Sequence, residues 1–348
     1  MSSRVSLLKC GQDVMASVKS VMELAGWQTF VPAGKDIVLK PNLGWDLFLP
    51  GCVTSPWVVE GVIQTVYDTC DNIYIADADQ VLVDIDKAAR KANFMPLTKK
   101  YKKVKWLNLS KQEMAEKEFN LGGKNFILPI PKILFECALV SVPVMKTHGR
   151  CVVSLSLKNQ WGCLPTTRHN FHPHLNEMIF QINSHLKPAF AVMDGTVCLE
   201  GNGPKSGKPK VCDVLLASSD LVALDTVAAK LMGFEPGDVH HVQYCAQKGF
   251  GTGDFSQIEV TGENLENFSF HFHRGVNNSV ASVEGILRSS FVSDLIFKTP
   301  LLSLCCAGAK IYYFFWYYFF GGGRKFKSQM LAHERYGKQW QEQGGVKP

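Results

Sequence analysis

The sequence predicts an α/β fold with a mostly parallel sheet, helices on both faces of that sheet, and an apolar aromatic C-terminal segment. Short apolar runs alternate with amphipathic helical patterns through the first two thirds of the 348 residues. This order favours parallel strands covered on both sides. The character then changes to an aromatic run. We expect an α/β ligand-binding or catalytic domain over residues 1–290, and an apolar aromatic anchor with a basic polar tail over residues 291–348.

Helices in the first half are identified by apolar residues at three- and four-residue spacing, and strands by short continuous apolar runs. A Ser-Pro pair is a favourable helix start, because Ser caps free amides and Pro fits the first helical position. The expected elements are a helix over Val14–Leu24 that stops at Gly26, a strand over Asp36–Leu39, a helix opened by Ser55 and Pro56, a strand over Asn72–Ala76 and a helix over Asp84–Phe94. The lysine-rich residues 99–117 are expected to form a solvated face.

The second half continues the alternation. A glycine directly after a helical pattern is a common stop signal, and Gly233 provides one. The expected elements are a strand over Cys137–Val144, a helix over Leu175–Leu186, strands over Ala189–Met193 and Val214–Ala217, a helix over Leu221–Met232, and strand and turn within Gln257–Phe272.

The composition limits the kinds of partner that the protein can bind and indicates its cellular compartment. The formal net charge of +6 is not concentrated in a basic arm with interleaved aromatics, which argues against nucleic acid. It suits an anionic small substrate or an anionic membrane surface equally well. The N-terminus lacks an apolar run of signal-peptide length, and the 11 cysteines then suggest thiols in the reducing cytoplasm. No cysteine pair has the C-x-x-C spacing of zinc ribbons or ferredoxins.

Polar residues follow the expected strands. In open parallel sheets, ligands bind outside the carboxyl ends of the strands. Asp and Asn also end strands simply as caps or turn residues, an explanation that serves Asp220 well. Lysine has no capping role at a strand exit, so a functional reading is stronger for Lys40 and Lys146. The residues at these exits are Lys40 and Asn42, Asp77 and Asp79, Lys146 and His148, Asp194, and Asp220.

The segment from Lys146 to His174 is the richest in functional groups. Lys146, Arg150, Lys158 and Arg168 are cations suited to phosphate or carboxylate, and Asn159 and Gln160 add fixed amides. Its histidines are candidate acids, bases or metal ligands, although loop histidines are often merely surface residues. They are His148, His169, His172 and His174.

A second dense segment runs from Asp194 to Gly207. Its glycines and prolines predict a loop with tight turns. Asp194 and Glu200 offer the oxygen ligands that hard cations such as Mg²⁺ prefer. A solvent-exposed hairpin is the alternative explanation.

Five blocks, spread over residues 35 to 255, give the chain a specific resemblance. They are VLKPNLG (38–44), VPVMKTHG (142–149), SLKNQWGCLP (156–165), VMDGTVCLEGNGPKSG (192–207) and SSDLVALDTVAAKLMG (218–233). Their order resembles the uncharacterised family catalogued as domain of unknown function 362. Some members of that family carry a ferredoxin-like module with iron–sulfur cysteines, which this sequence lacks. The resemblance therefore implies a domain and not a reaction.

These residues lead to the hypothesis of an enzyme that acts on an anionic, phosphate- or carboxylate-bearing small molecule, with a divalent cation such as Mg²⁺ as candidate cofactor. The alternatives are a non-catalytic membrane-associated binding or assembly protein, and a cysteine or iron–sulfur redox protein using Cys151, Cys163 and Cys198. The expected roles are catalysis by His148, Lys146 and Asp194, substrate binding by Lys40, Asn42, Lys158, Asn159 and Arg168, and metal binding by Asp194 and Glu200.

The residues Leu301 to Phe320 have just the length of a membrane span, but Lys310 lies at their middle, which is costly in lipid. Aromatic residues followed by cations at 324, 325 and 327 favour a peripheral or monotopic anchor over residues 299–327. Packing in the core or in a homodimer interface is the alternative. If the anchor reading holds, a chain ending at Thr299 should fold with its ligand site intact.

Overall fold

A computed structural model describes residues 3–276, 279–297 and 299–342 of the chain. Its main sheet contains β1 (Ser3–Lys9), β2 (Ile37–Pro41), β3 (Ile73–Asp77), β4 (Val104–Asn108), β7 (Ala138–Val142), β8 (Val144–His148), β9 (Val152–Ser154), β10 (Phe190–Glu200), β11 (Lys208–Ser218) and β12 (Ile258–Gly262). The path is β12-β1-β11-β10-β7-β2-β3-β4, with β8 and β9 joined through β10. Strands β10, β7, β2, β3 and β4 are parallel to one another, whereas β11 is antiparallel to both its neighbours. The predicted mostly parallel sheet is confirmed.

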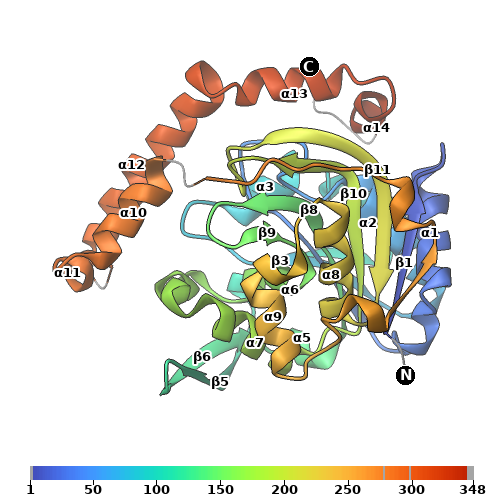
Figure 1. The fold of residues 1–348 in the computed structure, drawn as a ribbon, viewed down its shortest axis with the longest axis horizontal. Helices are drawn as coiled ribbons and strands as arrows, with labels where there is room; N and C mark the ends of the chain where they lie inside the picture. The colour runs from blue at the N-terminus through green and yellow to red at the C-terminus, as the bar shows by residue number, and fades with distance from the viewer. Residues whose placement is uncertain (1–2, 277–278, 298, 343–348) are drawn as a thin grey trace.

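Helices cover both faces of this sheet (Figure 1). One face packs against α1 (Val14–Leu24), α2 (Pro56–Val66), α3 (Ile85–Lys91) and α4 (Met95–Lys100), and the other against α5 (Ile133–Glu136), α6 (Ser156–Asn159), α7 (Leu175–Leu186), α8 (Leu221–Leu231) and α9 (His240–Gln247). Successive residues of a strand point to opposite faces. In β2, Ile37 and Leu39 accordingly enter one core and Val38 the other. Both sides of the strand are buried, which explains its continuous apolar sequence.

Capping aspartates and a terminal glycine explain why helices α1 and α8 have nearly the predicted bounds. The Asp13 carboxylate accepts a hydrogen bond from Ala16 N at the start of α1, and Asp220 accepts from Val222 N and Ala223 N at the start of α8. Gly233 follows α8 with a φ of 86°, a conformation that favours glycine.

Three segments differ from the predictions. The strand predicted over Cys137–Val144 is two strands, β7 and β8, and β8 continues through Lys146 to His148, so these residues lie within a strand and not after one. The lysine-rich residues contain β4 and the start of a hairpin, β5 (Met114–Leu121) with β6 (Lys124–Pro131), in which polar residues alternate with buried ones. The predicted loop after Met193 is in fact strand as far as Glu200, because β10 forms a long hairpin with β11. Since β11 runs back, Ser218 and Asp220 lie at the opposite end of the sheet from the other strand exits.

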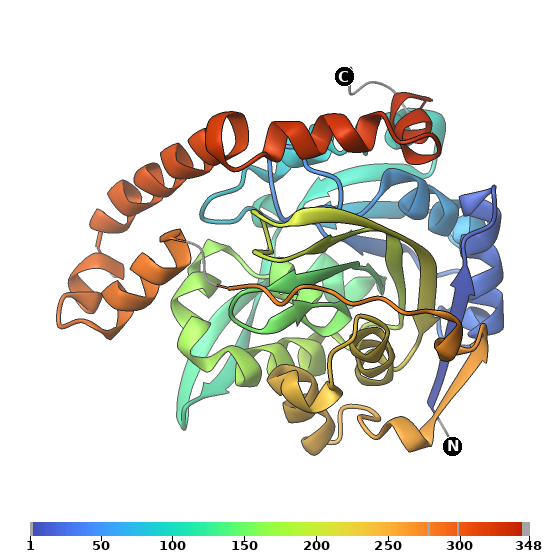
Figure 2. The ribbon, with the colours of Figure 1, turned by 45° about the horizontal axis from the view of Figure 1, so that its top comes forward.

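The C-terminal helices form two groups, one that projects from the body and one that packs on it. Helices α10 (Ser279–Ser289), α11 (Ser293–Phe297) and α12 (Leu301–Phe315) project away from the sheet, and a π-helical turn (Trp316–Phe320) leads to α13 (Gly323–Leu331) and α14 (Tyr336–Glu342), which return across the body (Figures 1 and 2). The ring of Trp57 lies 5.3 Å from that of Tyr336 and 4.9 Å from that of Trp340. The division predicted at residue 290 therefore does not coincide with a break in packing.

The aromatic cluster over residues 312–320 is present, but it is divided between inside and outside. Tyr313, Trp316 and Tyr317 are buried against the body, while Phe319 and Phe320 are exposed. Among the helices that the structure describes, none has the length and apolar character needed to cross a bilayer. The last six residues of the predicted polar tail lie outside the described part.

Candidate functional site

A cavity of about 230 Å³ lies beside the ends of β2, β3 and β8, below the projecting helix α10. Six cationic side chains line it, but only two carboxylates do: the cations are Lys40, Lys146, Arg150, Lys158, Arg168 and Lys205, and the carboxylates are Asp77 and Glu284. The structure thus brings the predicted residues Lys40, Asn42, Lys146, His148, Lys158, Asn159 and Arg168 to one cavity. Their roles there stay predictions.

Lys40 and Asp77 form a buried ion pair at the base of the cavity. The Lys40 ammonium lies 3.0 Å from the Asp77 carboxylate and also donates to Pro41 O at 2.7 Å. Asp77 accepts from the backbone amides of Leu43 and Ala78. A Cβ added at Gly162 would lie 2.8 Å from both charged groups, so glycine allows the chain to pass this close. The charge of Lys40 is therefore already balanced.

Lys146 and Lys205 also line the cavity, and neither has a carboxylate partner within the described ranges. The Lys146 ammonium donates to Asn42 Oδ1 at 2.6 Å and to Cys52 O at 2.9 Å, and among the described residues no carboxylate lies within ion-pair distance. Burial lowers the pKa of Lys146 to about 8. Burial likewise lowers the pKa of Lys205 to about 8, and its ammonium lies 5.6 Å from the ring centre of Tyr313. Such a pair favours an anionic ligand, which would supply the missing charge.

Arg168, Lys158 and Asn159 come from the segment after β9. The Arg168 guanidinium donates to Leu164 O, and burial lowers the pKa of Arg168 to about 10, so it stays charged at neutral pH. The Asn159 amide is occupied, because it donates to Lys40 O at 2.8 Å and to Ser141 Oγ at 3.0 Å. Lys158 has no ion-pair partner among the described residues, which leaves it available to a ligand.

His148 ends β8 and is a neutral imidazole. Burial lowers the pKa of His148 well below its usual value, and the neighbouring cations act in the same direction. Its Nδ1 accepts a hydrogen bond from Arg150 N at 3.1 Å, which places the proton of the neutral ring on Nε2. The side chain can therefore donate a hydrogen bond through Nε2 to a group in the cavity.

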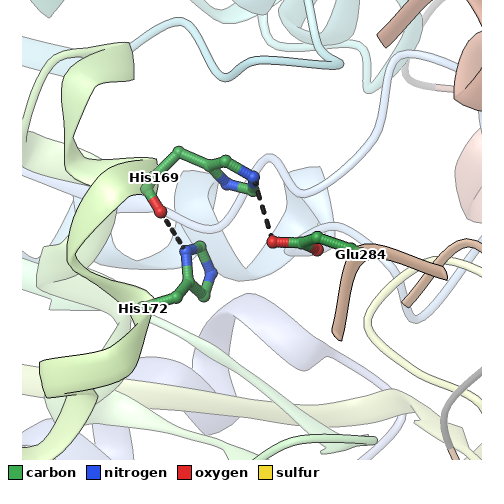
Figure 3. Close-up of side chains that lie close together, drawn as sticks. All are labelled: His169, His172 and Glu284. Atoms are coloured by element: carbon green, nitrogen blue, oxygen red, sulfur yellow. Dashed lines mark hydrogen bonds and ion pairs between the residues drawn. The ribbon is translucent and has the colours of Figure 1, made fainter. Parts of the chain in front are cut away.

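His169, His172 and Glu284 meet at the rim (Figure 3). Their ligand atoms lie within 4.8 Å of one another, and in the described part of the chain they are the one such group of metal-ligating side chains. His169 Nε2 lies 3.2 Å from Glu284. Two histidines and one carboxylate are a common set for catalytic zinc.

The charges around Glu284 favour a different role for this group. Its carboxylate also pairs with Arg150 at 2.9 Å and with Arg288 at 2.8 Å. Burial raises the pKa of Glu284, but the bonds from His169 and Arg288 outweigh it and lower that pKa overall. Because two guanidiniums already compensate the carboxylate and would repel a cation, the cluster is better suited to fastening α10 over the cavity.

Asp194 and Glu200 are not brought together, and neither lines the cavity. They stand six residues apart on β10, roughly 20 Å along an extended strand, so one cation cannot bind both. Asp194 is occupied by Ser55 N and by Thr196, and burial raises its pKa. Glu200 pairs with Lys210 at 2.9 Å. Their placement does not support the expected Mg²⁺ site or a catalytic role for Asp194.

The redox alternative also lacks geometric support. Cys151, Cys163 and Cys198 are buried, none lines the cavity, and burial raises the pKa of each thiol. No group of three cysteine ligands occurs within the described ranges.

Two charged lining residues have no counterpart in the prediction. Lys205 stands in the glycine-rich turn between β10 and β11, where a single cation among turn residues could have been noticed. Glu284 comes from α10, beyond the strands and in no motif, so no sequence signal points to it.

A curated relative and several solved structures are similar to this chain, and two of these structures are described here. The relative is the thylakoid-associated protein sll1697 of Synechocystis sp., 26% identical over 256 residues, which are 69% of this chain and 77% of the relative. The lactate racemase apoprotein from Thermoanaerobacterium thermosaccharolyticum gives a TM-score of 0.43 at 12% identity, over 66% of this chain and 57% of the racemase. A Thermotoga maritima protein gives 0.39 at 12% identity, over 74% of this chain and 62% of its own. The chain thus spans less than two thirds of either solved structure.

The family comparison covers the strands and loops that build the cavity. The family described as a domain of unknown function, DUF362, matches residues 37–230. This range holds Lys40, Lys146, Lys158, Arg168 and Lys205, and leaves out the C-terminal helices. The chain belongs to the DUF362 family.

Proposed function

We propose that the chain is an enzyme that acts on a small phosphate- or carboxylate-bearing molecule while docked at a membrane surface. One observation carries the proposal: six cationic side chains and only two carboxylates line a single cavity. Preplaced cations stabilise negative charge that is bound or that develops during a reaction.

Lys146 and His148 are the proposed acid–base residues. A lysine with a pKa of about 8 exchanges protons near neutral pH far more readily than an ordinary lysine. His148, held neutral by its buried position, donates through Nε2. Lys158 and Arg168 bind the anionic group, and the Lys40–Asp77 pair holds the base of the cavity in place.

Two observations support the membrane surface. The relative from Synechocystis is thylakoid-associated, and the C-terminal helices of this chain expose several large apolar side chains. Rings and aliphatic groups of this kind enter the headgroup region of a bilayer, and Lys310, Arg324 and Lys325 lie close to them in sequence.

The anion site is tested by titrating inorganic phosphate and pyrophosphate into the protein by calorimetry. Lys158→Ala should weaken binding by about 10- to 100-fold, the effect of one charge-assisted hydrogen bond. Lys124→Ala, an exposed lysine on the β5–β6 hairpin, is the matched control. Equal affinities in the wild type and Lys158→Ala would contradict the assignment.

Catalysis is tested separately from binding. A mixture of small phosphorylated and carboxylated metabolites, followed by NMR with and without the protein, should lose one component, and Lys146→Met should abolish the loss. Anion binding without any consumption would identify a non-catalytic binding protein instead.

A further inference from the structure

An apolar groove adjoins the cationic cavity. It lies between α10 and α12 and has a volume of about 360 Å³. Apart from His169 and Glu284, the described side chains that line it are apolar or weakly polar, among them Val283, Leu287 and Leu302. A groove with this lining favours a hydrocarbon over a polar ligand.

The groove and the cavity adjoin each other. Five residues line both spaces: Val81, Leu82, His169, Val280 and Glu284. A ligand that extends past these shared residues would place a charged group among the cations and an apolar part between the helices.

The outer surface of the same helices is apolar as well. Leu304, Ile311, Phe319 and Phe320 are 70%, 59%, 70% and 62% exposed. Leu304 and Ile311 belong to α12, and Phe319 and Phe320 belong to the π-helical turn that follows it. Soluble surfaces rarely expose so many large apolar side chains together, so this surface is suited to the headgroup region of a bilayer. The groove then opens where hydrocarbon chains are present.

We infer that the ligand of the cavity is an amphiphile drawn from the membrane, whose anionic head binds among Lys146, Lys158 and Arg168 and whose hydrocarbon tail lies between α10 and α12. This inference rests on the proposed function and adds the substrate class. The cationic lining of the cavity favours an anionic head. The border that the cavity shares with the groove indicates that the tail lies in the groove.

The test is a chain-length series of alkyl phosphates, from butyl to decyl, titrated below their micellar concentrations alongside inorganic phosphate. Each methylene buried in the groove should tighten binding about fourfold, until the groove is filled. Alkyl trimethylammonium of the same length should not bind, because its head is cationic.

Paired variants locate the tail. Ala309→Trp fills the groove and should flatten the dependence on chain length. Leu304→Trp, on the same helix but outside the groove lining, should retain it. The same dependence in wild type and Ala309→Trp would overturn the placement of the tail.

Other outcomes separate the two proposals. If phosphate binds and chain length has no effect, the amphiphile inference fails while the anion site stands. If neither phosphate nor any alkyl phosphate binds, the proposed function fails too. A groove occupied by a second copy of the chain would appear as a dimer that Ala309→Trp dissociates, and this result would also overturn the inference.

Discussion

At the scale of residues, the two buried lysines are costly for folding. The pKa of Lys146 falls from its ordinary value near 10.5 to about 8, which corresponds to roughly 3 kcal/mol of destabilisation at neutral pH. The unfolded chain holds this proton up to about pH 10.5 and the folded chain only to about 8, so folding stability rises between these values. Because burying Lys146 lowers the free energy of unfolding, its position is better explained by ligand binding than by packing.

The first prediction at this scale concerns pH. An anion stabilises the protonated forms of Lys146 and Lys205, so binding of inorganic phosphate should take up protons near pH 8 and weaken as pH rises further. Calorimetry in two buffers of different ionisation enthalpy measures the uptake. Lys146→Met should reduce it, and proton release on binding would contradict the assignment.

Sequence reasoning at this scale finds the cations that lie near the carboxyl ends of parallel strands. Lys40 and Lys146 reach one cavity because β2 and β8 belong to the parallel part of the sheet, although both residues lie within their strands. Asp194 does not reach it, because it lies well inside β10 and its carboxylate is held by Ser55 and Thr196. Glu284 could not be found, since its position depends on how a distant helix docks.

At the scale of elements, the arm formed by α10, α11, α12 and the π-helical turn after them combines the apolar groove with an exposed apolar surface. Its π-helical turn rotates the aromatic run, so that Trp316 and Tyr317 face the body while Phe319 and Phe320 face outward. Composition alone predicts an apolar segment here. It cannot predict this division, which depends on contacts with Trp45 and Phe48.

The prediction for this arm concerns membrane binding. The double substitution Phe319→Ser and Phe320→Ser should reduce cosedimentation with vesicles of phosphatidylglycerol and phosphatidylcholine by roughly tenfold or more, because each ring loses apolar burial. Ile127→Ser, an exposed apolar residue on the distant β5–β6 hairpin, should leave cosedimentation unchanged. Equal loss in both variants would argue against a specific membrane face.

Some elements were predictable because their signals are local. Helix α1 has the predicted bounds, since apolar spacing and a capping aspartate define it. Strands β4, β5 and β6 are not predicted: β4 and the start of β5 lie in the lysine-rich stretch, and β6 contains Pro129 and Pro131, residues that are unusual inside a strand. Their pairing partners, and not their composition, make them strands.

At the scale of the whole molecule, the two ends of the chain share one core. Arg335 pairs with Asp213 at 3.2 Å and donates to Gly11 O, and Tyr336 and Trp340 are fully buried against Trp57. A chain ending at Thr299 would expose Trp57, contrary to the expectation from composition. It would also lose Tyr313 from the cavity lining.

The corresponding prediction is a loss of stability on Trp340→Ala. Removing this ring should lower the free energy of unfolding by about 3–5 kcal/mol, since it leaves a cavity beside Phe48 and Trp57. Chemical denaturation measures the change. Phe320→Ala, which removes an exposed ring, is the control. Similar stabilities for both variants would mean that α14 does not complete the core.

The return of α14 to Trp57 also sets an order of events during synthesis. Trp57 and the strand β2 are translated well before Tyr336 and Trp340, whose rings cover this side of the sheet. The nascent domain must hold an uncovered apolar surface until α14 has been translated. Chains that terminate before α14 would retain that surface permanently, which makes them natural targets for chaperones and proteases.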